Sequence, residues 1–296
     1  MSRAPYPEHV SKDAQLAWEA KWARPAALAA AFAATLPIAG VIVPRLLLDG
    51  PLRNRVDLLL AAGREPEAFV AGGIVQALGM IALAGVFVYL HDAARARYRS
   101  TPPVARILAV VGPLLLAAVY VATQVAFTST GAEFAASGSR TTARADQLVR
   151  AGPLATIESV RFGAGAAFGI AWILIGLSIM RAGLVSRFVG TLGIVIGVLN
   201  AIPIILPVVL QTFWLGAIAV LLLDRWPGGR GPAWETADAT PWPARASASR
   251  GRAVDEASRS DTEAPEGTAG AREQHRASDG DEEPRPMAPR KRKRRR

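Results

Sequence analysis

Cysteine is missing from this sequence, and histidine occurs at only three of its 296 positions. Without cysteine the chain can form no disulfide, no thiolate metal site and no cysteine nucleophile. The histidines are His9, His91 and His275, and two of them lie outside the apolar segments. A transmembrane haem held by two histidines of one chain is therefore excluded. We expect no metal and no cofactor.

Charge is equally scarce in the long apolar segments, which lack Asp, Glu, Lys and His except at their ends. Ion-coupled carriers and membrane-embedded proteases depend on ionisable or nucleophilic groups at depth. The nearest ionisable pair, Glu158 and Arg161, has the three-residue spacing of a surface salt bridge. The glycines at 163 and 165 lead into an apolar segment instead of following a strand, so they form no phosphate loop. We expect no catalytic residue and no enzymatic activity.

Apolar residues make up 51% of the chain and are gathered into long blocks. A helix needs about 20 apolar residues to cross about 30 Å of hydrocarbon. The blocks therefore predict an all-α fold, a polytopic membrane bundle of about six transmembrane helices within residues 26–224. The predicted spans are residues 26–48, 69–90, 107–127, 162–180, 188–204 and 207–223.

The uncharged run from Phe188 to Leu223 is too long for one crossing and supplies the last two predicted spans. Asn200, Pro203 and Pro207 interrupt its middle. Each proline removes a backbone donor and biases the residue before it away from helical geometry. We interpret the run as a helical hairpin, and one long kinked helix is the alternative.

Segments with tryptophans flank the transmembrane domain. Residues 1–25 predict an interfacial helix, because Trp18 and Trp22 share one face at i,i+4 spacing and suit the headgroup layer. Residues 225–243 form a juxtamembrane segment rich in proline and glycine. Its tryptophans are Trp226, Trp234 and Trp242.

Residues 244–296 contain few apolar side chains other than alanine, and this composition predicts a disordered tail. The tail ends in seven consecutive cations, Arg290, Lys291, Arg292, Lys293, Arg294, Arg295 and Arg296. Each cation gains about 1 kcal/mol near an anionic leaflet, so contact with anionic lipid headgroups is the favoured interpretation. A protein partner is an alternative. Nucleic acid, whose phosphates are bound equally without regard to sequence, is less favoured.

The distribution of Lys and Arg predicts the orientation. Residues 91–106 carry four arginines against one acidic residue, and Arg181 and Arg187 flank a short turn. Since cytoplasmic loops are enriched in Lys and Arg, we expect both termini inside. The longest internal connection, residues 128–161, then lies outside. Heavy use of Ala, Arg, Gly and Pro is typical of a bacterial genome and indicates the bacterial inner membrane.

Few polar side chains interrupt the predicted spans. The candidate intramembrane polar contacts are Gln76, Tyr120, Gln124, Asn200 and Gln211. Glycines with four-residue spacing are predicted to pack helices closely: Gly165 with Gly169, and Gly193 with Gly197. We expect packing within the chain, and a homo-oligomer is the alternative.

Two stretches carry a resemblance to known proteins, Leu184-Val-Ser-Arg-Phe-Val-Gly-Thr-Leu-Gly-Ile194 and Arg225-Trp-Pro-Gly-Gly-Arg-Gly-Pro-Ala-Trp-Glu235. With them, the chain resembles an uncharacterised family of six-span bacterial, mostly actinobacterial, integral membrane proteins, grouped as a domain of unknown function. The resemblance covers the last two spans and the Trp-Pro-Gly-Gly segment, and the earlier spans only in layout. It implies the fold and no chemistry.

These observations favour a membrane protein that packs, scaffolds or senses through its bundle, with a basic tail that holds anionic lipid or a partner. The alternative is a permease for a small neutral or lipophilic solute, for which the intramembrane amides would be the contacts.

Overall fold

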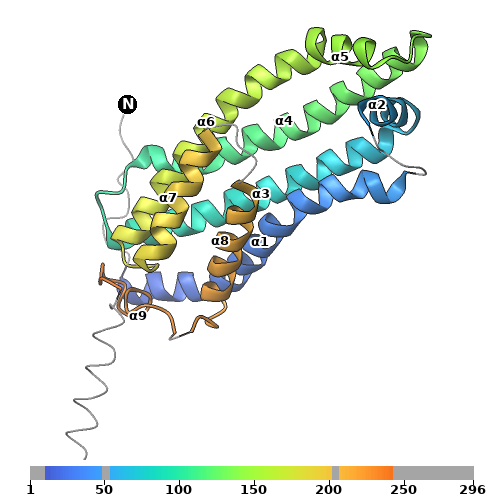
Figure 1. Cartoon of the computed structure of the whole chain (residues 1–296). Helices are drawn as coiled ribbons and strands as arrows, with labels where there is room; N and C mark the ends of the chain where they lie inside the picture. Colours follow the sequence, from blue (N-terminus) through green and yellow to red (C-terminus); the bar gives the residue numbers. More distant parts are fainter. Residues whose placement is uncertain (1–10, 49–53, 202–206, 228, 243–296) are drawn as a thin grey trace, which may run out of the picture. The chain divides into compact units, whose positions relative to one another are not determined.

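The computed structural model describes residues 11–48, 54–201, 207–227 and 229–242, and every regular element in these ranges is a helix (Figure 1). The chain divides into two units, residues 1–244 and 245–296, and the helices belong to the first. They are α1 (Lys12–Leu47), α2 (Arg55–Arg64), α3 (Pro66–Arg97), α4 (Pro103–Ala136), α5 (Thr142–Ala151), α6 (Pro153–Arg181), α7 (Arg187–Ala201), α8 (Pro207–Leu222) and α9 (Ala233–Thr236). The prediction of an all-α fold is confirmed.

Four of the described helices, α1, α3, α4 and α6, are long and apolar enough to cross a membrane. They have 36, 32, 34 and 29 residues, and all of them exceed the hydrocarbon thickness at about 1.5 Å per residue. The predicted spans 188–204 and 207–223 correspond to α7 and α8, with 15 and 16 residues. Both are apolar but shorter than a full crossing, and residues 202–206 between them lie outside the described ranges.

The expected interfacial helix of residues 1–25 is not a separate element. Residues from Lys12 onward belong to α1, which runs through Pro25, Pro37 and Pro44. The reason is packing: residues of α1 are buried on both sides of Pro25. These residues are Glu19, Ala23, Ala26, Ala27, Ala30, Ala33, Ala34, Gly40 and Pro44. Because α1 is packed on both sides of Pro25, it stays one continuous helix where the sequence suggested two helices.

The helices meet at two distinct ends of the bundle (Figure 1). At the α9 end lie the start of α1, the end of α3, the turn between α6 and α7, and α9. At the α5 end, α2 and α5 pack on α4 around Leu59, Phe134, Ala145 and Leu148. The predicted outer loop of residues 128–161 is thus mostly helical, since α4 and α6 extend into it and α5 bridges them.

α7 and α8 are antiparallel neighbours. The Gln211 amide donates to Asn200 Oδ1 at 2.9 Å, and the Trp214 indole donates to Val189 O at 2.9 Å. A continuous helix would separate Val189 from Trp214 by about 37 Å at 1.5 Å per residue. The run from Phe188 to Leu223 therefore reverses direction as a hairpin, packed between α6 and α1.

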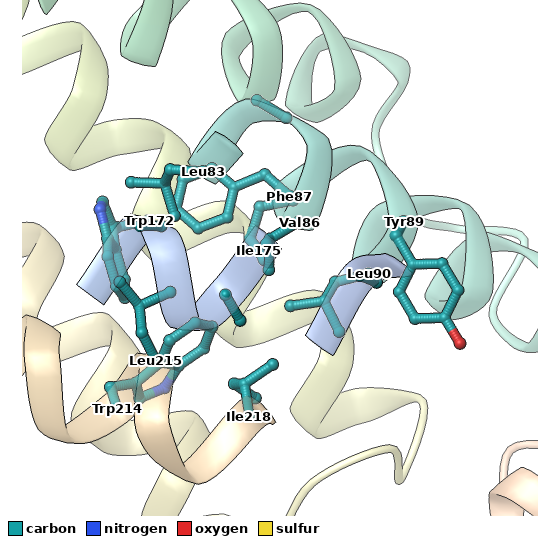
Figure 2. Packing of buried hydrophobic residues seen from close by; sticks show 14 of the residues in the cluster. Leu83, Val86, Phe87, Tyr89, Leu90, Trp172, Ile175, Trp214, Leu215 and Ile218 are labelled. Carbon is teal, nitrogen blue, oxygen red and sulfur yellow. The ribbon is translucent and has the colours of Figure 1, made fainter. Parts of the chain in front are cut away.

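Aromatic and branched side chains fill the core where α3, α6 and α8 meet (Figure 2). The ring centroids of Phe87 and Trp172 are 5.1 Å apart, and those of Trp172 and Trp214 are 4.7 Å apart. Both pairs have the edge-to-face arrangement that aromatic quadrupoles favour. Ile175, Leu215 and Ile218 surround them (Figure 2).

Glycines permit the closest contact between α6 and α7. A Cβ added at Gly169 would lie 2.5 Å from Gly197 O, and one at Gly165 would lie 3.3 Å from Asn200 O. Gly193 faces the Trp214 indole in the same way, at 3.1 Å. All four predicted packing glycines therefore lie against other parts of this chain. The same device joins α1 to α3, where Gly40 and Gly72 meet backbone to backbone.

Replacing Gly169 with alanine should destabilise the bundle by about 1–3 kcal/mol, because the added methyl group meets a backbone oxygen that cannot move alone. Thermal unfolding in lipid nanodiscs measures this. Gly163→Ala in the same helix is the control, since a Cβ there meets nothing within 4 Å. Equal melting temperatures for the two variants would contradict the close contact.

Candidate functional site

A buried ion pair joins the start of α1 to the end of α3. Arg97 donates to both carboxylate oxygens of Glu19, from Nη1 at 2.5 Å and from Nη2 at 2.8 Å. The Arg97 side chain is fully buried and that of Glu19 is 4% exposed. This parallel, two-point geometry is the strongest form of a charge-assisted hydrogen bond.

Further hydrogen bonds and stacked aromatic rings surround this ion pair. Gln15 donates to Glu19 Oε1 at 2.8 Å, and the Tyr89 hydroxyl donates to Glu19 O at 3.2 Å. The Tyr89 ring stacks between Trp18 and Trp234, with centroid distances of 5.4 and 6.4 Å. We name Trp18, Glu19, Tyr89, Arg97 and Trp234 the α9-end cluster. Its charges are shielded from solvent and largely satisfied.

The segment after α8 is fastened to this cluster, and we name its described residues, 225–227 and 229–242, the strap. Arg97 Nε donates to Ala233 O at 2.8 Å, and the Trp234 indole donates to Leu184 O at 2.8 Å. The Trp234 ring lies between two guanidinium groups, 5.4 Å from Arg97 and 5.8 Å from Arg230. Arg230 in turn donates to Leu221 O at 3.2 Å. The strap is therefore part of the bundle's packing.

The turn between α6 and α7 approaches the strap so closely that it requires a glycine. Gly183 has φ +73°, and a Cβ at this position would lie 1.9 Å from Thr240 O. Only glycine combines this backbone conformation with so close an approach. The strap also contains Ala237 at φ 56°, an uncommon conformation for a residue with a side chain.

The predicted intramembrane polar contacts do not form one site. Asn200 and Gln211 bond each other, and Asn200 also donates to Ile196 O at 2.8 Å. Gln76 is buried beside Gly40 at the α1–α3 contact. Gln124 packs against Gly73 at the α3–α4 contact, one helical turn from Tyr120. Each amide lies at a helix contact.

Among the described residues, two buried polar side chains have nitrogen atoms without a hydrogen-bond partner: His91, at both ring nitrogens, and Trp172, at its indole nitrogen. Both belong to the close-packed helices α3 and α6. In the described ranges no group of three potential metal ligands comes together. The seven terminal cations, Arg290 to Arg296, lie outside these ranges.

Sequence reasoning missed the Glu19–Arg97 pair because its partners are 78 positions apart. One signal was available. Glu19 falls on the same helical face as Ala23, Ala26 and Ala30, so a carboxylate occupies an otherwise small, apolar stripe. A charge on a buried face implies an opposite charge nearby.

The chain matches no protein-family model, and comparisons with curated proteins and with solved structures find no match. The resemblance to the six-span actinobacterial family therefore stays a prediction. The described residues define a class of protein: an all-α protein in which four of the described helices are able to span a membrane.

Glu19→Ala should destabilise the bundle by about 3–5 kcal/mol, since it leaves the Arg97 charge buried without a counterion. Denaturant unfolding of the protein in mild detergent measures this. Lys12→Ala is the matched control: its pair with Asp238 is exposed, and such pairs contribute about 0–1 kcal/mol. A double variant, Glu19→Leu with Arg97→Met, should recover part of the loss, whereas strictly additive losses would contradict a buried pair.

Proposed function

We propose that this chain is a multi-pass protein of the bacterial inner membrane that catalyses no reaction and serves as a scaffold, holding its basic tail at the cytoplasmic surface for contact with anionic lipid. One observation carries the proposal. The strap, from which the tail continues, is bonded to the bundle through Arg97 and Trp234. A segment that only linked two independent parts would need no such attachment.

The orientation in this proposal rests on the positive-inside rule, which relates cytoplasmic loops to Lys and Arg content. Eleven described Lys and Arg residues lie at the α9 end and seven at the α5 end. The first group is Lys12, Lys21, Arg24, Arg95, Arg97, Arg99, Arg106, Arg181, Arg187, Arg225 and Arg230. The second group is Arg45, Arg55, Arg64, Arg140, Arg144, Arg150 and Arg161. We place the α9 end, and with it both termini, in the cytoplasm.

Because α7 and α8 form a hairpin, this orientation does not depend on how deeply the two helices enter the membrane. Two complete crossings give six spans, and a hairpin that enters and leaves by the same surface gives four. Both arrangements return the chain to the α9 end, where the strap is bonded. The tail thus starts on the same side as α1.

The packing of the amides favours a scaffold over the permease. A permease needs polar side chains free to exchange bonds with a solute, whereas Gln211 donates to Asn200 and Asn200 donates to Ile196 O. Interhelical amide bonds of this kind stabilise packing in lipid.

Replacing all seven cations of residues 290–296 with glutamine should abolish salt-sensitive binding of the protein, held in neutral nanodiscs, to vesicles containing phosphatidylglycerol. The expected loss is large, because each cation contributes about 1 kcal/mol at an anionic surface. Vesicle flotation at low and high salt measures it, with phosphatidylcholine vesicles as the control. Unchanged binding to the anionic vesicles would overturn the role of the tail.

The absence of cysteine makes the orientation directly testable. A single cysteine at Ala136, exposed at the end of α4, should react with a membrane-impermeant maleimide on intact spheroplasts. One at Ala246 should react only after the membrane is opened. Labelling of Ala246→Cys on closed spheroplasts would contradict a cytoplasmic tail.

A further inference from the structure

Near the end of α3, one buried side chain has no partner for its polar atoms. His91 is fully buried, and neither Nδ1 nor Nε2 has a hydrogen-bond partner among the described residues. It stands one helical turn after Phe87, whose ring packs against Phe168 and Trp172 of α6. The adjacent Leu90 is fully buried as well. The imidazole is therefore enclosed by packed helices at the α9 end of the bundle.

The charged groups that act on His91 are more basic than acidic. They are the carboxylate of Asp92 and the guanidinium groups of Arg95 and Arg106. Asp92 already accepts two hydrogen bonds from Arg106, at 3.1 and 3.4 Å, which join the end of α3 to the start of α4. A positive charge on His91 would compete with Arg106 for this carboxylate.

The helices packed on α3 supply no further acid for His91 within the described ranges. Glu133, the one acidic residue of α4, lies at the opposite, α5 end. Residues 162–180 of α6 contain no titratable side chain. On α1, the buried carboxylate of Glu19 is bonded to Arg97. Protonation of the enclosed imidazole would thus leave a buried charge without a counterion of its own, which proteins avoid.

This enclosure ties the packing to pH. A histidine in water takes up a proton near pH 6.5. The closed packing keeps the His91 ring neutral, because the charged ring would be unpaired there. A state in which the ring reaches water binds the proton below about pH 6.5. The open state then holds more protons than the closed state, so acidification favours opening.

We infer that His91 is a proton-controlled switch in the packing of the α9 end: the closed arrangement of α3 against α4 and α6 requires a neutral ring, and proton uptake opens it. In the orientation proposed above, the proton comes from the cytoplasm. The side from which it comes rests on the proposed function. The switch itself does not, because it is tested in detergent, where both ends of the bundle meet the same solution.

Thermal unfolding of the full-length protein in mild detergent tests the switch. Between about pH 7.5 and about pH 5.5, the melting temperature of the parent should fall by about 3–5 °C more than that of His91→Gln, which has no group to protonate at this position. His91→Leu, with an apolar side chain of similar size, should likewise lack this additional fall. Equal pH dependence of the parent and either variant would overturn the switch.

His275→Gln is the matched control. The composition of residues 244–296 predicts a disordered tail, in which a histidine is protonated alike whether the bundle is open or closed. This variant should therefore keep the pH dependence of the parent. Loss of that dependence in His275→Gln would place the response in the tail and contradict the role of His91.

A single cysteine locates the opening. Ala105 is fully buried in the first turn of α4, beside Arg106, whereas Ala136 is exposed at the α5 end. The labelling rate of Ala105→Cys is divided by that of Ala136→Cys, which removes most of the pH dependence of the thiol reagent. From about pH 7.5 to about pH 5.5 this ratio should rise by up to about tenfold. With His91→Gln added it should stay constant, and an equal rise there would overturn the inference.

Discussion

Contact between helix backbones is the constraint on which this structure depends. In lipid, apolar side chains gain nothing by leaving hydrocarbon for one another, so helices associate through close packing and hydrogen bonds. α1 meets α3 with a face of alanine, glycine and proline, and α6 meets α7 through glycines. At both contacts, carbonyl oxygens lie where a side chain would otherwise be. Large aromatic side chains gather at the three-helix junction around Trp172 and Trp214, and a second group, with Leu59 and Phe134, lies at the α5 end.

The same constraint explains where polar groups occur. An amide or carboxylate cannot exchange its partner for water inside a packed bundle, so it must be satisfied by the chain. Asn200 and Gln211 achieve this at the hairpin, and Glu19 achieves it with Arg97. A buried ion pair adds little net stability over apolar residues of the same shape, but it penalises every arrangement in which the partners are apart. The Glu19–Arg97 pair therefore specifies how α1 is placed along α3.

The sequence predicted what depends on local composition: the helical class, the reversal within the run from Phe188 to Leu223, and six apolar segments, of which four lie in helices long enough to cross a membrane. The sequence did not predict the features that depend on contacts between residues far apart in the chain. An interfacial helix separate from the first span was predicted for residues 1–25, yet buried residues on both sides of Pro25 belong to one continuous helix, α1. The glycines at four-residue spacing were recognisable, whereas Gly40 and Gly72, which meet across two helices, carry no pattern of their own. The Glu19–Arg97 pair was not predicted, for the same reason.

The strap connects these features to the surface of the bundle. Arg97 uses one part of its guanidinium group for Glu19 and another for Ala233 O, so the placement of α1 on α3 and that of the strap share one side chain. Trp242, at the far end of the strap, packs on Gly231 and lines a small apolar cavity together with residues of α7 and α8. A change in the packing of α7 against α8 therefore acts directly on Trp242, the last described residue of the strap. A change in the position of α1 reaches the strap through Arg97.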